Sequence, residues 1–180
     1  VKAAENLRRM QRQGILAQDA QSGYYVYRLG MGDHVQTGLV AAASVDAYDR
    51  GRIKKHEFTR PVKEDDRVRQ IEALNAQTGP VFLVYPARAP VDSILAKVAE
   101  REPEVDILAA GDVRHRLWPI TDPGVIAELD RDFEAMQALY VADGHHRSAA
   151  AVQRFHVTQT LTHVLRRRFD RFGAELRRVV

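Results

Sequence analysis

The residues best suited to chemistry stand together in the segment Asp143-Gly144-His145-His146-Arg147. A short apolar run precedes this segment, and an Ala-rich stretch of high helix propensity follows it. We therefore expect a buried strand that turns through the glycine directly into a helix. The free backbone N–H groups and the positive dipole end of such a helix attract phosphate. His145, His146 and Arg147 can add charged donors in the same turn.

The same segment also fits a purely structural joint between a strand and a helix. Aspartate is a favoured N-cap, and Asp-Gly is a common turn. Capping accounts for Asp143 and Gly144, but it gives no reason for two histidines and an arginine in one turn. We interpret the segment as a phosphate-binding site, with the structural joint as the alternative.

A second group of charged and titratable residues comprises Lys54, Lys55, His56, Glu57 and Arg60. It lies between an expected hairpin and an expected helix, where a loop can present side chains to a cleft without burying charge. Glu57 is the natural general base for a substrate hydroxyl, with His56 as the alternative. The lysines and the arginine can neutralise phosphate oxygens during transfer. An ordinary solvated loop is the competing interpretation.

Four residues of the helix that follows are further pocket candidates. Asp66 and Arg67 lie in its first turns, where carboxylates suit the helix dipole and pair with arginines, so a solvated face is the simpler interpretation. Asn75 and Thr78 stand where the helix should end, and a substrate contact there competes with plain capping.

Adjacent histidines point to different sides of a helix. They make a poor paired metal site unless one of them partners a residue from elsewhere, such as His56. We therefore predict no resident metal ion, and expect any Mg²⁺ to arrive with a nucleotide.

The motifs give the chain a recognisable resemblance. Asp-Gly-His-His-Arg resembles the Asp-Gly-x-His-Arg motif of the free serine kinases in the ParB/sulfiredoxin superfamily. With Ile-Lys-Lys-His-Glu-Phe-Thr-Arg at 53–60, Lys-Glu-Asp-Asp-Arg at 63–67 and Asn-Ala-Gln-Thr-Gly-Pro at 75–80, it is similar to domain-of-unknown-function family 1015. The resemblance covers residues 2–155. Members of that family are longer and have an N-terminal portion not seen here, so we expect the chain to be a fragment.

The resemblance implies phosphoryl transfer to or from a small hydroxyl metabolite such as serine, with ATP or ADP and Mg²⁺ as cofactors. The related kinases use a glutamate as base and the Asp-Gly-x-His-Arg turn for phosphate, which implies these roles for Glu57 and for residues 143–147. One alternative is a binding module that senses a nucleotide or phosphorylated metabolite without turnover. A weaker alternative is association with nucleic acid.

Composition narrows the classes of protein. With 180 residues, 45% of them hydrophobic, the chain can bury the core of one domain or slightly more. The chain contains no cysteine, which excludes disulfides, zinc–cysteine sites and the thiol chemistry of sulfiredoxin. No apolar run approaches the roughly 20 residues that span a bilayer, so we expect a cytoplasmic protein without membrane contact. Neither a P-loop nor a Gly-x-Gly-x-x-Gly motif occurs.

The net charge of +3 is concentrated near the C-terminus. The arginines there are Arg166, Arg167, Arg168, Arg171, Arg177 and Arg178. We interpret this cluster as the solvated face of one helix, because a nucleic-acid surface needs basic charge spread over a folded face. We accordingly predict an α+β domain over 1–155 and a basic helical segment over 156–180, which can derive from a later part of a longer chain.

The patterning predicts an α+β fold in which helices flank a mixed sheet, with a ParB/sulfiredoxin-like element around the segment 143–147. Helices are expected over 3–13, from 61 to 79, over 91–101, after Pro123, after Gly144, and around Leu161, Val164, Leu165, Phe169 and Phe172. Strands are expected over 24–29, 35–45, 81–85 and 113–120, with residues 46–53 forming a turn.

Overall fold

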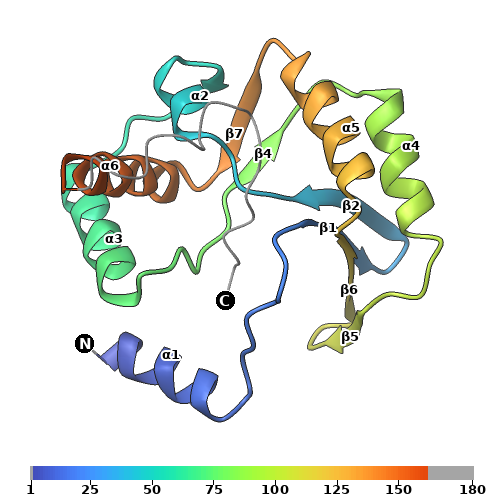
Figure 1. Ribbon diagram of the computed structural model, residues 1–180, viewed down its shortest axis with the longest axis horizontal. Helices are drawn as coiled ribbons and strands as arrows, with labels where there is room; N and C mark the ends of the chain where they lie inside the picture. Colours follow the sequence, from blue (N-terminus) through green and yellow to red (C-terminus); the bar gives the residue numbers. More distant parts are fainter. Residues whose placement is uncertain (1, 162–180) are drawn as a thin grey trace.

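The computed structural model describes residues 2–161, and within them an α+β fold forms around two sheets (Figure 1). The elements are α1 Lys2–Arg12, β1 Tyr24–Met31, β2 His34–Val40, α2 Val45–Asp49, β3 Ile53–Lys54, α3 Pro61–Leu74, β4 Phe82–Val84, α4 Ala89–Val98, β5 Val105–Ala109, β6 Val113–Ile120, α5 Pro123–Glu134, β7 Leu139–Asp143 and α6 His145–Leu161. This confirms the predicted fold class. The expected helix around 161–172 and most of the basic segment lie outside the described residues.

The larger sheet is antiparallel and has the strand order β2-β1-β6-β5. The β1–β2 hairpin closes where the sequence predicts it, with Met31 opposite His34. Strand β5 was not predicted, because four of its five residues are exposed and no half-buried alternation marks it. Its hairpin with β6 turns at Gly111 and Asp112, whose positive φ angles of 78° and 56° suit a type I′ turn.

The smaller sheet is mixed and has the order β3-β7-β4. Strand β3 runs parallel to β7, and β4 runs antiparallel to it. The strands thus form the predicted mixed sheet and, in addition, a separate antiparallel sheet. The prediction that 81–85 form a buried strand is wrong, because β4 is an edge strand with Phe82 and Val84 exposed. A short apolar run cannot by itself distinguish a central strand from an edge strand.

Helix α2 occupies the first part of residues 46–53, which the sequence predicts to be a turn. Strand β2 ends at Val40, short of the predicted Val45, and α2 follows after four residues without regular structure. The Ser44 hydroxyl caps α2 by accepting a hydrogen bond from the backbone N–H of Ala47 at 3.3 Å. Tyr48 on this helix is buried, so tertiary packing stabilises a helix of only five residues.

The core lies between the antiparallel sheet and the neighbouring helices α4 and α5 (Figure 1). Its members include Tyr24, Val26, Trp118 and Ile120 from β1 and β6, Val91 and Leu95 from α4, Leu129 from α5, and Leu139 and Val141 from β7. Because β7 contributes to this core, the start of α6 is fixed to the rest of the domain.

Arg52 fixes β3 beside the start of β7. Its guanidinium donates hydrogen bonds to the backbone carbonyls of Phe133, Glu134 and Met136 at 2.8, 2.6 and 2.9 Å, which caps the C-terminal end of α5. The backbone N–H of Leu139 donates to the Arg52 carbonyl at 3.0 Å. These bonds place the loop after β3 beside the turn that follows β7.

None of the helices described here has the length and apolar character needed to cross a lipid bilayer.

Candidate functional site

The turn between β7 and α6 has the predicted geometry. The strand ends at Asp143, the helix begins at His145, and Gly144 joins them with a φ of 95° that side chains rarely adopt. The backbone N–H of Ser148 donates to the Gly144 carbonyl at 2.9 Å. The N–H groups before Ser148 have no acceptor within the helix, as at any helix start. The prediction of a helix N-terminus directly after a strand is confirmed.

The loop after β3 contacts this turn. Oε2 of Glu57 lies 3.5 Å from Nδ1 of His145. The ring of His56 meets the ring of His145 edge to face, with a centroid distance of 4.4 Å. The backbone N–H of Arg60 donates to Nε2 of His146 at 3.1 Å. Two motifs that are far apart in the sequence are therefore adjacent in space.

A cleft of about 790 Å³ opens where these segments meet α3. Helices α3 and α6 lie side by side on this part of the molecule (Figure 1). The cleft is lined by the cations Lys63, Arg67, Arg69 and Arg147, the carboxylates Glu57, Asp66 and Asp143, the imidazoles His145 and His146, and mostly uncharged residues of 62–79 and 142–144. Cations outnumber carboxylates, so the cleft can accept an anion.

Arg147 is held at one wall of the cleft. Its Nη2 donates to Oδ2 of Asp143 at 2.5 Å, which uses one of the five N–H donors of the guanidinium. The side chain passes closely over two glycines: a Cβ on Gly79 would lie 2.9 Å from Cδ of Arg147, and one on Gly144 3.1 Å from its Nε. The two glycines thus leave the space that the arginine occupies.

His145 is the most unusual side chain in the cleft. It is only 4% exposed, yet its buried Nε2 has no hydrogen-bond partner in the part of the chain that the structure describes. His56, Glu57 and His145 each offer one ligand atom, and these atoms lie within 4.8 Å of one another. Among the described residues, this cluster is the group of side chains arranged to hold a metal ion.

The other predicted residues divide into two groups. Asp66, Arg67 and Thr78 line the cleft, while the remaining candidates, Lys54, Lys55, His56, Arg60 and Asn75, are not among its lining residues. The ammonium of Lys55 lies 4.3 Å from the ring centroid of Tyr48. Asn75 ends α3 in the left-handed conformation with a φ of 51°, which accounts for it as a helix cap.

Sequence reasoning missed several lining residues, among them Lys63, Arg69 and Gln77. Helical spacing was the available signal, because Lys63, Arg67 and Gln70 follow one another at the spacing that places residues on one helix face. Gln77 carried no such signal. Its amide donates to the Gly79 carbonyl at 3.2 Å, which stabilises the turn beneath Arg147.

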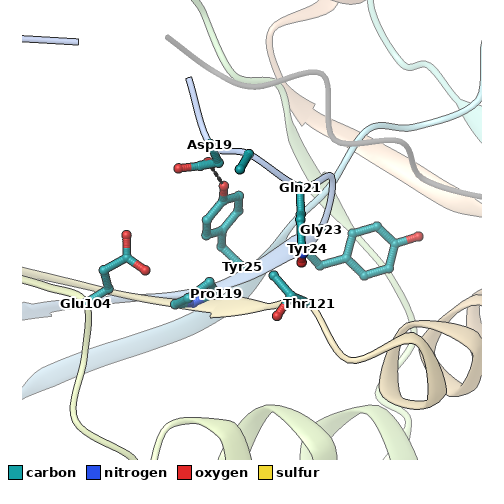
Figure 2. A pocket seen from close by; sticks show the side chains of 9 residues that line it. Asp19, Gln21, Gly23, Tyr24, Tyr25, Glu104, Pro119 and Thr121 are labelled. Carbon is teal, nitrogen blue, oxygen red and sulfur yellow. Dashed lines mark hydrogen bonds between the residues drawn. The ribbon is translucent and has the colours of Figure 1, made fainter. Parts of the chain in front are cut away.

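A second pocket, of about 240 Å³, lies at the start of β1 (Figure 2). The Tyr25 hydroxyl points to Asp19 and donates a hydrogen bond to its carboxylate (Figure 2). Burial raises the pKa of Tyr25, and the charge of Glu104 raises it further. The residues that line this pocket include two carboxylates and no cation, so it does not suit an anionic ligand.

The structure is an α+β fold with a cleft at a strand-to-helix turn. The chain matches the family described as protein of unknown function (DUF1015) over residues 1–173, and it belongs to this family. The matched range continues beyond Phe155, where the resemblance seen in the sequence fades. No curated protein and no solved structure shows a significant match.

Proposed function

We propose that this DUF1015 protein is a phosphoryl-transfer enzyme that acts on a small, serine-like hydroxyl metabolite or on its phosphate ester. One observation carries the proposal: Glu57 and the segment 143–147 line a single cleft. A carboxylate that can accept a proton thus lies beside a helix N-terminus that can hold phosphate.

The phosphate would bind at the start of α6. There the backbone N–H groups, the guanidinium of Arg147 and the imidazole of His146 are donors on one wall. Because Nε2 of His146 accepts the Arg60 N–H, a neutral His146 carries its proton on Nδ1, which is then free to donate. Lys63 and Arg67 of α3 add positive charge from the other side.

In the transfer step, Glu57 would accept the proton of the substrate hydroxyl. The hydroxyl oxygen forms a bond to the terminal phosphorus of ATP or ADP, and the bond from that phosphorus to the leaving nucleotide oxygen breaks. Glu57 is well exposed, so it can release the proton to solvent. Mg²⁺ carried with the nucleotide would neutralise phosphate charge, and the carboxylates of Asp66 and Asp143 are ligands of the kind it prefers.

A binding module that senses the same ligands without turnover is the second candidate. The exposure of Glu57 favours it, because general bases usually act in sites that exclude water. Association with nucleic acid is a weaker proposal that depends on arginines outside the described residues, and salt-dependent DNA binding would test it. A cytoplasmic location, expected from the sequence, is part of the proposal.

Phosphorus NMR of the protein with serine, phosphoserine, ATP and ADP tests the proposal. We expect phosphate exchange between the nucleotide and serine, and a loss of about a hundred-fold or more in Glu57→Gln with nucleotide affinity retained. Glu128→Gln, an exposed substitution on α5, serves as the control. Binding without exchange in the unaltered protein would establish the binding module instead, and the absence of both would contradict both candidates.

A further inference from the structure

We propose that His56, Glu57 and His145 bind a transition-metal ion of the Zn²⁺ class at the edge of the cleft. Two imidazoles and one carboxylate are a ligand set that Zn²⁺ and related ions accept, with the remaining coordination positions left open. The residues come from two segments, the loop after β3 and the first residue of α6. No part of the phosphate chemistry proposed above is needed for this ion to bind.

The spacing of the ligand atoms fits such an ion. In a tetrahedral site with bonds near 2.0–2.1 Å, ligand atoms lie roughly 3.3 Å apart. Nδ1 of His145 lies 3.5 Å from Oε2 of Glu57, and Nε2 of His56 lies 3.8 Å from Oε1 of Glu57. These two distances involve different oxygens of Glu57. One atom from each residue can be chosen so that all three lie within 4.8 Å of one another, and rotation of the exposed His56 and Glu57 side chains would bring them to the tetrahedral spacing.

The environment of His145 is the independent observation. A buried imidazole in a purely structural role has hydrogen-bond partners, because an unsatisfied buried polar group costs roughly 1–3 kcal/mol. His145 is 4% exposed, its Nδ1 faces the Glu57 carboxylate at 3.5 Å, and its Nε2 has no hydrogen-bond partner within residues 2–161. At 3.5 Å, Nδ1 and the carboxylate oxygen are too far apart for a good hydrogen bond, so a cation between these two atoms would supply the ring with a bond at Nδ1.

The backbone holds the ligands in place while leaving two of them adjustable. The bond from the Arg60 N–H to His146 ties the loop to the first turn of α6, where His145 lies. The side chains of His56 and Glu57 are 61% and 60% exposed, so they can turn toward an ion without disturbing the core. One buried ligand and two exposed ones permit the ion to bind after folding.

The ion would also change the role of Glu57. Because a carboxylate bound to a metal cannot act as a free base, a hydroxide bound to the ion would accept the proton of the substrate hydroxyl in the metal-loaded protein and become bound water. Glu57 and His145 both line the cleft, so the open coordination positions would adjoin the phosphate site. This consequence for catalysis rests on the proposed function, whereas the binding of the ion does not.

Titration calorimetry of protein freed of any affinity tag tests the site, with Zn²⁺ alone as the probe. We expect one ion per chain and, with Co²⁺, visible absorption bands of a four- or five-coordinate complex. Loss of one ligand in His56→Ala or Glu57→Gln should weaken Zn²⁺ binding about ten-fold or more, since loss of a mere outer partner already costs 10–100-fold. His34→Ala removes an exposed histidine from β2 and should leave affinity unchanged.

The variants are chosen because His145 is buried and its substitution can prevent folding. His56 and Glu57 are exposed, and thermal melts in a chelator will show that their variants fold as the unaltered protein does. Absence of stoichiometric binding, or equal Zn²⁺ affinity in His56→Ala and the unaltered protein, would overturn the proposal. Phosphoserine affinity measured in the chelator reports on the phosphate site separately, so failure of one proposal is distinguishable from failure of the other.

Discussion

The antiparallel sheet and the cleft use charged residues in different ways. On the sheet, Asp106 of β5 accepts two hydrogen bonds from Arg114 of the adjacent β6, at 2.6 and 2.7 Å, and lies 3.4 Å from Arg116. These charges satisfy one another between neighbouring strands. In the cleft, charges converge from α3, the loop after β3 and the start of α6, and Nε2 of the buried His145 is unsatisfied among the described residues.

The difference distinguishes a surface from a site. Charges that pair with adjacent residues require only local structure, and such exposed pairs contribute little to stability. Charges brought together from distant segments, at an energetic cost, are typical of places that bind ligands. If this contrast holds, substitutions at the contacts that hold the cleft together should have larger effects than substitutions on the sheet.

The largest loss of stability is expected for Arg52→Gln. The guanidinium of Arg52 caps three carbonyls at the end of α5, and hydrogen bonds of charged groups contribute about 1.5–3 kcal/mol each. The matched substitution is Arg101→Gln, because Arg101 donates to only two carbonyls, at 3.3 and 3.2 Å, beside the antiparallel sheet. Chemical unfolding should show the larger loss in Arg52→Gln, and equal losses would refute the anchoring role.

A smaller loss is expected for Gly144→Ala, together with weaker phosphate binding. A side chain at positive φ costs about 1–2 kcal/mol, and the new Cβ would also displace Arg147. Gly111→Ala is the control, because Gly111 has a φ of 78° and open space around it. Both variants should lose stability in urea unfolding, but only Gly144→Ala should lose phosphoserine affinity. Unchanged affinity in Gly144→Ala would argue against a site at this turn.

The smallest effect is expected on the sheet. Hydrogen bonding from Arg114 lowers the pKa of Asp106 below its ordinary value. The pair therefore stabilises the fold above the ordinary pKa of aspartate, and this contribution is lost as the pH falls through the lowered folded-state pKa. Asp106→Asn should be slightly less stable than the unaltered protein at neutral pH, with the difference vanishing in acid. Urea unfolding between pH 2 and 7 measures it, and a difference that grows in acid would be inconsistent with this sign.

Local signals sufficed to predict the turn that bears the site. An apolar run, a glycine and an Ala-rich stretch together specify a strand that turns into a helix, and the structure has this arrangement at Gly144. Local signals failed where tertiary contacts decide the outcome. Packing of Tyr48 makes α2 a helix, and β5 is exposed enough to lack any pattern.

The composition of the cleft was only partly predictable for the same reason. From its charge alone, Lys55 was expected to contact phosphate, but its ammonium lies against the ring of Tyr48. No local sequence signal indicates that contact. The helical spacing of Lys63, Asp66 and Arg67 could have identified Lys63 as a further residue that lines the cleft. The sequence suggested His56 as a possible partner for one of the adjacent histidines, and the folded structure identifies that histidine as His145 and adds Glu57 to the cluster.

The most direct test of the phosphate site is calorimetric titration of Arg147→Lys with phosphoserine, ADP and ATP. Lysine keeps the charge but cannot meet phosphate bidentately. We expect phosphate-ligand affinity to fall about ten- to a hundred-fold, corresponding to roughly 1.5–3 kcal/mol, with the melting temperature nearly unchanged. Arg50→Lys is the matched control, because Arg50, the C-cap residue of α2, pairs with Asp46 at the same i,i+4 spacing. Unchanged affinity with a lowered melting temperature would reduce Arg147 to a partner of Asp143 and contradict the phosphate site.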